Sequence, residues 1–253
     1  MNFSTDKLDL LQKGMKGYNP DVYNLVGEVS SAVSQVALIL LGVFCVLNLF
    51  QMIEKAHKNG GVVEPSVVMS EVLKYMIAFL MIMYSKEILD TILFFSVRIV
   101  KIIAHFLDSG VKLEEWKGGK GILGNVFNLL YMIASWVGDI VSQLVIMLRF
   151  AQMYLLKAIA PIMVAFFMQD GLRSIAVNFL KTFAGYALQG FLLVVIMIVF
   201  PKLITSNIFI LSDLGNKFDK FKAPMIVIVQ MVLYILTIYG SQRLAKSLMN
   251  ANG

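Results

Sequence analysis

The residues of this sequence that could do chemistry are the charged and polar side chains that interrupt its long apolar stretches. Residues 126–200 hold two apolar blocks, and the candidate functional residues within and between them are Asp139, Arg149, Lys157, Pro161, Arg173, Asn178, Lys181 and Gln189. A charged side chain at the centre of a membrane-spanning helix costs about 2.5 to 3.5 kcal/mol on insertion scales, so it needs a protein partner or water. These eight residues therefore predict a polar surface that lies between helices or lines a channel.

The spacing of these residues indicates helices with polar faces. On a helix over residues 125–152, Asp139 and Arg149 share one face with smaller polar side chains. The predicted partners of Asp139 lie on its own helix or on a neighbouring helix or subunit, and they are Gln143, Arg149, Lys157 and Lys181.

The second apolar block and the helix after it carry the remaining candidates. Pro161 removes the backbone hydrogen bond that would reach the carbonyl of Lys157, which predicts a kink there. Further along, Asn178, Lys181 and Gln189 share a helix face with small residues. Small and amide side chains on one stripe favour close helix packing over a lumen-lining role.

The composition of the 253-residue chain excludes an ordinary soluble domain. It is 58% hydrophobic and 15% charged, with a mean hydropathy of +0.78, whereas soluble domains carry about 25% charged residues. We therefore expect an all-α, polytopic integral membrane protein with five or six transmembrane helices plus an amphipathic helix, embedded in a lipid bilayer. The net charge of +6 comes mostly from lysine, which indicates topology determinants or lipid-headgroup contacts more than nucleic-acid ligands.

The sequence has no motif for a cofactor, a metal or catalysis. Cys45 is the only cysteine, and His57 and His105 are far apart, so we expect neither a disulfide within the chain nor a metal site. The glycine-rich stretch 108–125 lacks the order of a phosphate-binding loop. The sequence also shows no pattern of a nucleophilic side chain paired with a catalytic base, so we expect no enzyme activity and no cofactor.

Shifts between polar and apolar composition divide the chain into five parts. A polar N-terminal segment, residues 1–28, closes on the turn signal Tyr18-Asn19-Pro20-Asp21 and fits either an amphipathic surface helix or a partner-binding tail. The other parts are residues 29–107 with a first transmembrane helix, a short second span and an amphipathic helix; a polar glycine-rich loop, 108–125; a transmembrane core, 126–246; and a C-terminal tail, 247–253.

Residues 67–107 are too long for one crossing, since a single helix would run about 60 Å, twice the hydrocarbon thickness. We expect a break near residues 84–87, and an ion pair between Glu71 and Lys74. Beyond the break a stripe with acids first and bases last consists of Glu87, Asp90, Phe94, Arg98, Lys101 and His105. The stripe predicts an amphipathic helix on the membrane surface or packed as an extension of the second span; the alternative is that it lines a conduit.

Prolines mark the predicted ends of the last two spans. The span that begins near residue 174 is expected to stop at Pro201, and the final span, residues 224–239, to carry Pro224 in its first turn. Arg243 and Lys246 then predict a cytoplasmic C-terminus under the positive-inside rule. The side of the N-terminus stays open, because six crossings place both ends on one side and five place the N-terminus outside.

The stretch from Arg149 to Leu193 resembles the core of the TrbL-type polytopic membrane subunit of conjugative type IV secretion systems. The matching elements are an arginine, an Ala-Pro-Ile, a second arginine, and an Asn-x-x-Lys followed by glutamine, at positions Arg149, 160–162, Arg173, Asn178, Lys181 and Gln189. The chain lacks the extended soluble domain of larger members. This is typical of a compact version, as in conjugative elements of Gram-positive bacteria.

The resemblance implies a channel or platform subunit of the cytoplasmic membrane, through which single-stranded DNA with its attached relaxase, or an effector protein, is passed. It implies as partners the hexameric secretion ATPases, the bitopic scaffold subunit of the same machine and further copies of this chain in a homo-oligomer. It also implies transient contact with the single-stranded DNA–relaxase substrate. The ATPases would supply the energy, and this chain a path or a seal in the membrane.

Two other functions fit the same residues. A self-contained secondary transporter would bind a solute and a coupling ion at broken helices, but it predicts an internal repeat that the two halves of this sequence do not show. A purely structural membrane scaffold would use its charges only to hold helices together.

Overall fold

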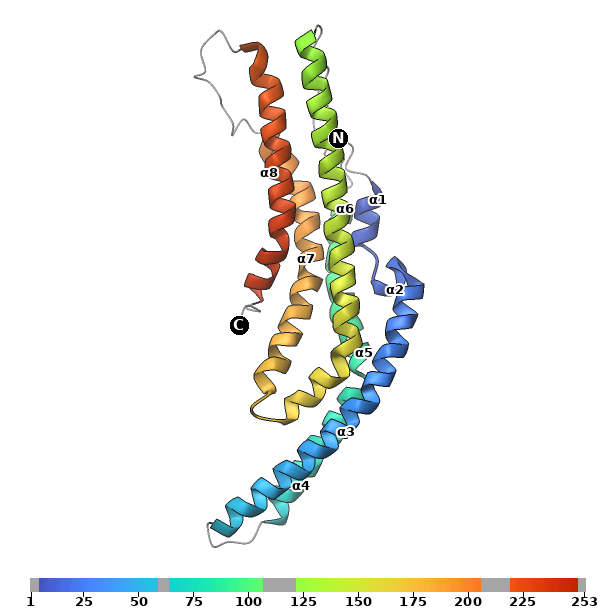
Figure 1. Ribbon diagram of the computed structural model, residues 1–253, viewed down its shortest axis with the longest axis vertical. Helices are drawn as coiled ribbons and strands as arrows, with labels where there is room; N and C mark the ends of the chain where they lie inside the picture. The colour runs from blue at the N-terminus through green and yellow to red at the C-terminus, as the bar shows by residue number, and fades with distance from the viewer. Residues whose placement is uncertain (1–4, 59–63, 107–121, 206–218, 250–253) are drawn as a thin grey trace. The chain divides into compact units, whose positions relative to one another are not determined.

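The structure, a computed structural model, describes residues 5–58, 64–106, 122–205 and 219–249. All regular elements in these ranges are helices, which confirms the predicted all-α fold (Figure 1). In chain order they are α1 (Thr5–Leu11), α2 (Met15–Tyr18), α3 (Pro20–Lys58), α4 (Pro65–Met83), α5 (Ser85–Phe106), α6 (Ile122–Ala165), the 3₁₀ turn η1 (Phe166–Met168), α7 (Arg173–Thr205) and α8 (Asp219–Leu248). The predicted loop 108–125 lies outside the described residues up to residue 121, and the tail 247–253 is described only to Met249.

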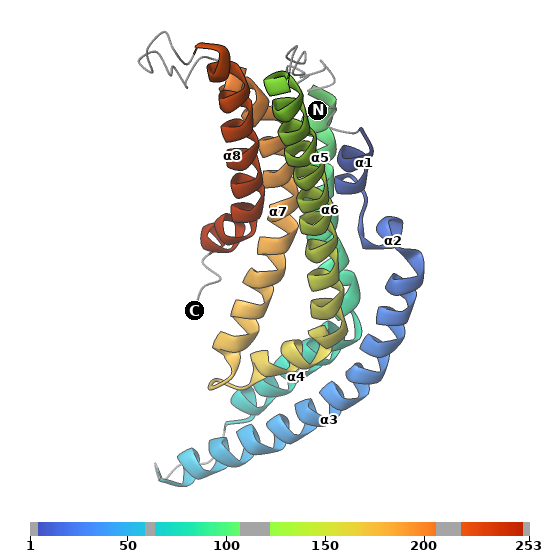
Figure 2. The same ribbon diagram turned by 45° about the horizontal axis from the view of Figure 1, so that its top comes forward.

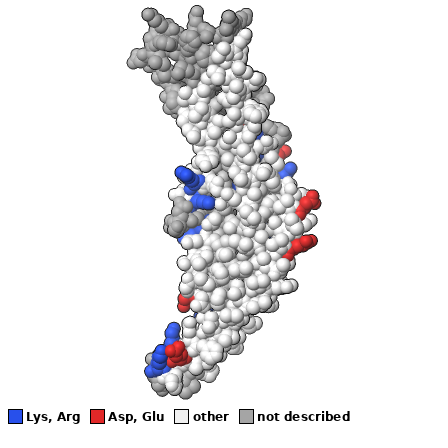
Figure 3. All heavy atoms as spheres, in the orientation of Figure 1, with Lys and Arg blue, Asp and Glu red and all other residues white. Residues whose placement is uncertain are grey.

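Four of the described helical stretches are long and apolar enough to cross a membrane: Pro20–Lys58, Pro65–Met83, Gly124–Met168 and Arg173–Phe200. Large apolar side chains are exposed along the first three stretches, whereas on the fourth only Ile175 and Val199 are exposed. Most of the face drawn in Figure 3 is accordingly free of charged side chains. An apolar exterior of this extent suits contact with lipid, since soluble monomers rarely expose large contiguous apolar patches.

The chain forms two compact units. Unit 1 consists of residues 1–13, 95–150 and 186–245, and unit 2 consists of residues 14–94, 151–185 and 246–253. The helices α5, α6, α7 and α8 each contribute one part to each unit, and the part of α8 in unit 2 is only its last three residues.

Unit 1 is built on apolar side chains from α6, α7 and α8. Ile146, Phe150, Leu193 and Ile238 are each at most 1% exposed. The rings of Phe200 on α7 and Tyr234 on α8 lie 5.6 Å apart between centroids. Burial of such side chains stabilises each by about 1.5 to 3 kcal/mol relative to exposure in water, and in lipid the same contacts act through close packing.

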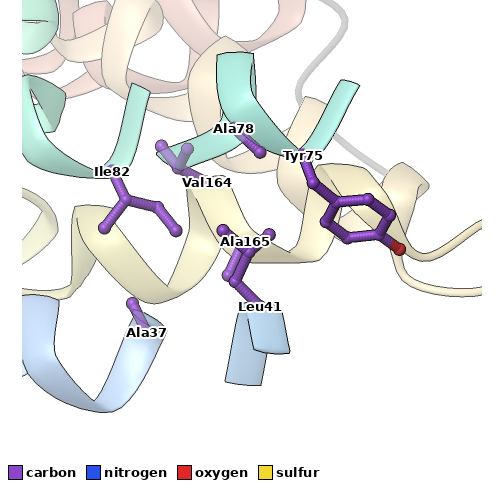
Figure 4. Packing of buried hydrophobic residues seen from close by; sticks show 7 residues of the cluster. All are labelled: Ala37, Leu41, Tyr75, Ala78, Ile82, Val164 and Ala165. Carbon is purple, nitrogen blue, oxygen red and sulfur yellow. The ribbon is translucent and has the colours of Figure 1, made fainter. Parts of the chain in front are cut away.

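Unit 2 is built on α3, α4 and the end of α6. In both views α3 and α4 lie side by side (Figure 2). Their contact is filled by a cluster that Figure 4 shows, made of Ala37, Leu41, Tyr75, Ala78, Ile82, Val164 and Ala165. Three of these seven residues are alanine, and small side chains let helix backbones approach closely.

The start of α3 differs from the predicted span boundary. The helix begins at Pro20, nine residues before residue 29, and of the predicted turn at residues 18–21 only Asn19 is non-helical and caps its N-terminus. The side-chain oxygen of Asn19 accepts a hydrogen bond of 3.1 Å from the backbone N–H of Val22. Proline suits the first helical position because its missing N–H would have no partner there.

The break predicted near residues 84–87 is confirmed at Tyr84, between α4 and α5. The Tyr84 N–H donates to the carbonyl of Leu80 at 2.9 Å, and the Ile88 N–H donates to the carbonyl of Tyr84 at 3.0 Å. Helical hydrogen bonding therefore resumes after an interruption of one residue. The predicted Glu71–Lys74 ion pair is also present, at 2.8 Å.

The two apolar blocks on either side of Arg149 form one helix instead of two. α6 has 44 residues and continues past Pro161 to Ala165. A proline removes one backbone hydrogen bond, and a helix can continue where neighbouring helices and local adjustments satisfy the freed carbonyl.

The predictions about the last prolines have different outcomes. The membrane-compatible stretch of α7 ends at Phe200, as predicted, although the helix itself continues past Pro201 to Thr205. The prediction for Pro224 was wrong. α8 begins at Asp219, so Pro224 lies beyond its first turn. The pattern of apolar residues ends near these prolines, but hydrogen bonding of the backbone does not require apolar side chains, so the helices extend into polar sequence.

Candidate functional site

Arg149 is the most deeply buried of the predicted site residues, with 0% of its surface exposed. It lies on α6 in unit 1. Its Nε donates a hydrogen bond of 2.8 Å to the carbonyl of Tyr186, and its Nη2 donates one of 3.3 Å to the carbonyl of Ala187. Both carbonyls belong to α7, so the guanidinium joins α6 to α7.

Gly190 on α7 leaves the space that the guanidinium fills. A Cβ atom added at Gly190 would lie 2.4 Å from the guanidinium carbon of Arg149. Side-chain atoms do not approach that closely, so any larger residue would displace the arginine. The two residues are distant in the sequence, and no spacing rule predicts that they meet.

Further polar contacts bring α5 and α8 to the same part of α7. The hydroxyl of Ser96 on α5 donates to the carbonyl of Ala187, and Nε2 of Gln189 donates to the Ser241 hydroxyl on α8 at 3.3 Å. We refer to Ser96, Arg149, Gln189 and Ser241, with the α7 carbonyls they contact, as the Arg149 layer. It links the four long helices of unit 1.

The charge of Arg149 is balanced by dipoles and not by an acid. Among the described residues no carboxylate lies within ion-pair distance of Arg149, and its Nη1 has no hydrogen-bond partner there. Desolvating a charged group costs several kcal/mol, and hydrogen bonds to carbonyl oxygens offset part of that cost. The arginine is therefore sheltered by neighbouring helices, as a charge inside a membrane protein must be.

Asp139 has a partner that sequence reasoning missed. Its Oδ1 lies 2.5 Å from Nζ of Lys7, which belongs to the short N-terminal helix α1. Lys7 is 7% exposed, whereas half of the Asp139 side chain is exposed. The pair joins residues 132 positions apart, so α1 is docked onto α6. The partner of Asp139 is therefore not one of the four predicted residues, which were Gln143, Arg149, Lys157 and Lys181.

Lys157 lies in unit 2 and is the centre of a second polar contact. Its Nζ is 2.7 Å from both carboxylate oxygens of Asp90 on α5. Tyr23 on α3 donates its hydroxyl hydrogen to Oδ2 of Asp90 at 2.7 Å, and its ring centroid lies 3.9 Å from the lysine nitrogen. We call these three residues the Asp90–Lys157 cluster. Lys157 is 1% exposed, so its ammonium group contacts Asp90 and the Tyr23 ring instead of bulk water.

A tyrosine one turn before this lysine fixes the N-terminal part of unit 2. The hydroxyl of Tyr154 donates to the carbonyl of Met15 at 2.6 Å and lies 3.2 Å from that of Asn19. These are the residues that precede α3. The start of α3 is therefore attached to α6 by Tyr154 as well as by the Asp90–Lys157 cluster.

The structure does not bring the remaining predicted residues into either contact. Pro161 is buried in α6, one turn after Lys157. Arg173 is exposed and lines a cavity of about 530 Å³ in unit 2, whose other charged residues are Lys55, Glu71, Lys74 and Asp170.

Asn178 and Lys181 are half-buried on α7 in unit 2. The carbonyl of Asn178 accepts a hydrogen bond of 2.7 Å from the Thr182 hydroxyl. For Lys181, the described part of the chain contains no hydrogen-bond or ion-pair partner. Asp139, Arg149 and Gln189 thus belong to unit 1, and the other five predicted residues to unit 2.

The sequence contains little or no pattern that would identify several of the residues in these contacts. Asp90 was part of the predicted stripe on 87–105, but nothing in that stripe identifies Lys157 as its partner. Ser96 and Tyr23 have no signal, since serine and tyrosine are common on helices of any kind. The pairing of Lys7 with Asp139 could be found only by docking α1 on α6.

The chemistry of these contacts is electrostatic. Within the described ranges, no three residues of the types histidine, cysteine, aspartate and glutamate gather to hold a metal ion. Comparisons with protein-family models, with curated proteins and with solved structures find no match to this chain.

Proposed function

We propose that this chain is a multi-pass subunit of the cytoplasmic-membrane platform of a conjugative type IV secretion machine. In this proposal one or both of α5 and α8 cross the membrane in addition to the four membrane-compatible stretches, giving five or six passages, and the C-terminus is cytoplasmic. The subunit helps single-stranded DNA with its attached protein to cross the membrane, and secretion ATPases and a bitopic scaffold subunit are its partners.

The observation that carries the proposal is the Arg149 layer. The stretch that resembles the TrbL-type family begins at Arg149 and includes Gln189, and both residues are buried in contacts that link α5, α6, α7 and α8. Two of the five polar residues of the resemblance, Arg149 and Gln189, are thus among those that hold these helices together. This supports a common architecture more strongly than a match between apolar helices would.

The orientation of the buried polar side chains also bears on where a substrate could pass. In unit 1 Arg149 and Gln189 point into contacts between helices of the same copy, with 0% and 1% of their surfaces exposed. They leave no charged lumen around them, so in this proposal the path for the substrate lies between copies of the chain or between the chain and other subunits.

Deleting the gene tests the proposal. In a donor cell that carries the conjugative element, we expect loss of the chain to lower DNA transfer by at least a hundredfold, and the wild-type gene in trans to restore it. Complementation with Arg149→Leu should fail or be weak, at equal abundance in the membrane, while Lys55→Ala at an exposed position should complement fully. Transfer at the wild-type level without the chain would rule the proposal out.

A structural scaffold is the second candidate, and a specific observation favours it. The buried charges Arg149 and Lys157 both have partners within the same copy. A scaffold of this kind would assemble the secretion platform without contact with the substrate. Photo-crosslinking from this chain separates the two functions, because only a subunit that contributes to the path should crosslink to transferring DNA.

A further inference from the structure

Two cations on α5 are exposed in unit 1 and are not used by any contact described above. Arg98 and Lys101 lie one turn apart on the face of α5 that also exposes Phe95 and Ile102. The opposite face of α5, with Ser96, Val97, Val100 and Ala104, is buried. In the described part of the chain neither cation has a hydrogen-bond or ion-pair partner.

The neighbouring helix α7 defines the membrane depth of these cations. Residues 182–201 of α7 are a run of twenty without a charged residue, and twenty helical residues span about 30 Å, the thickness of the hydrocarbon core. Lys181 and Lys202 flank the run. This is the part of α7 that lipid would surround.

The contact between Ser96 and the carbonyl of Ala187 fixes α5 against that run. Arg98 and Lys101 follow Ser96 by two and five residues, which is about 3 and 8 Å along the helix axis. The two helices run in the same direction in both views (Figures 1 and 2). The cations therefore lie near the levels of Gln189 and Leu192, at the middle of the uncharged run.

Lipid cannot solvate charges at this depth. About 15 Å of hydrocarbon lies on either side of the middle of the bilayer, and long basic side chains reach the headgroups only from near helix ends. Other protein or water must therefore surround Arg98 and Lys101. Because they are exposed and no described residue of this copy pairs with them, we place what surrounds them outside the described part of the copy.

The residues on this exposed face of α5 indicate which kind of molecule contacts it. The α5 residues of unit 1, from Phe95 to Phe106, include no acidic residue. Phe95, with 64% of its surface exposed, stands one turn before Arg98. Cations beside an exposed aromatic ring are side chains that proteins use to hold a single nucleic-acid strand, because phosphates pair with the cations and bases stack on the ring.

We infer that the α5 face formed by Phe95, Arg98, Lys101 and Ile102 lines a water-filled passage enclosed by several copies of this chain, and that the strand it contacts is single-stranded DNA. The inference rests on the proposed function and adds the residues that meet the substrate. It assigns the passage to α5, a helix outside the family resemblance, and it gives the passage a positive wall at the middle of the membrane.

Cysteine labelling tests whether water reaches this face. In a Cys45→Ser background, Arg98→Cys and Lys101→Cys are treated in intact membranes with a charged, membrane-impermeant thiol reagent. Leu148→Cys is the matched control, because Leu148 is exposed on α6 next to Arg149 and so lies at a similar depth. We expect both α5 cysteines to react at least ten times faster than Leu148→Cys. A cysteine is neutral and draws no water in by itself, so equally slow labelling would overturn the passage.

Charge reversal and crosslinking test the substrate. At equal membrane abundance, Arg98→Glu with Lys101→Glu should lower DNA transfer at least tenfold, Arg98→Lys should leave it near the wild-type level, and Lys13→Glu, at an exposed position just after α1, should also leave it unchanged. A photo-crosslinking residue at position 98 should capture transferring DNA. Capture only of further copies of this chain would mean a dry subunit interface, and would overturn the contact with DNA.

These results separate the inference from the proposed function. If deletion of the gene abolishes transfer but position 98 is neither labelled nor crosslinked to DNA, only the passage on α5 fails. If transfer continues without the chain, the proposed function fails, whatever the labelling shows.

Discussion

At the scale of single residues, Arg149 and Gly190 depend on each other. The guanidinium lies where a side chain at position 190 would be, and its hydrogen bonds to α7 need that close approach. In most helices a glycine costs about 0.5 to 1 kcal/mol relative to alanine. At position 190 we expect replacement of glycine by alanine to destabilise the protein instead, because the added methyl group would overlap the Arg149 side chain.

We expect Gly190→Ala to destabilise unit 1 by about 1 to 3 kcal/mol, the usual cost of overpacking a filled core. Gly240→Ala on α8 is the control, since no heavy atom lies within 4 Å of its added Cβ, and it should be neutral or slightly stabilising. Thermal unfolding of the purified protein in detergent measures both. Equal melting temperatures for the two variants would mean that Arg149 can move aside without cost.

The Asp90–Lys157 cluster allows a second residue-scale prediction. Asp90→Asn leaves the buried Lys157 without a counter-charge, and removing one partner of a buried ion pair costs about 3 to 5 kcal/mol. We expect the lower end of that range, because a third of the Asp90 side chain is exposed. The double variant Asp90→Asn, Lys157→Met should recover much of the loss, since it removes the stranded charge.

Thermal unfolding in detergent also measures the stability of the wild type, of Asp90→Asn and of the double variant. The control is Glu54→Gln, which breaks the exposed Glu54–Lys58 pair and should change stability by less than about 1 kcal/mol. A double variant no more stable than Asp90→Asn alone would show that the lysine is not what makes the single change costly.

At the scale of elements, α1 is held on α6 by few groups. It has only seven residues, too few to be a stable helix by itself in water. Its described anchors are the ion pair of Lys7 with Asp139 and the buried side chain of Leu11. The docking of α1 should therefore respond to a change in a single charge.

We expect Lys7→Ala to weaken the docking of α1 by about 1 kcal/mol, since the partner Asp139 is half exposed. Amide hydrogen exchange in residues 5–11 should then become about fivefold faster. Lys13→Ala, at an exposed position just after α1, should leave the exchange unchanged. The swap Lys7→Asp with Asp139→Lys should restore slow exchange; if it does not, the ion pair is not what holds α1.

At the scale of the whole molecule, the outward surfaces of the described helices are apolar, apart from a few charges. Lipid can cover the apolar part, but the exposed cations of α5 in unit 1 need protein or water around them. A single copy in a bilayer would leave them unsheltered. Association with further copies removes this cost.

We therefore expect the protein to be a homo-oligomer when it is purified in a mild detergent. Light scattering should give a protein mass that is a multiple of 28.3 kDa. Replacing both cations with apolar residues, Arg98→Leu with Lys101→Leu, should lower that mass, since the change removes the charges whose shelter favours association. A wild-type mass of 28.3 kDa at concentrations well above those in the membrane would contradict assembly through copies of this chain.

The sequence alone determined the features that depend on composition and on near neighbours. Its apolar content predicts helices fit for a membrane, and the polar residues near position 84 predict the interruption between α4 and α5. The pair Glu71–Lys74 follows from helix geometry over three residues. These predictions succeed because a helix satisfies its backbone within one segment, and side chains three or four residues apart meet whatever the rest of the chain does.

Only the tertiary structure decided which partner each buried charge has. Asp139 meets Lys7, and Lys157 meets Asp90, across separations of 132 and 67 residues, while Arg149 meets carbonyl groups that every residue carries. Periodicity gives the face of a helix on which a charge lies but not the helix that packs there. That choice follows from the shapes of all the helices together, such as the space left by Gly190, and a pattern along the chain does not contain it.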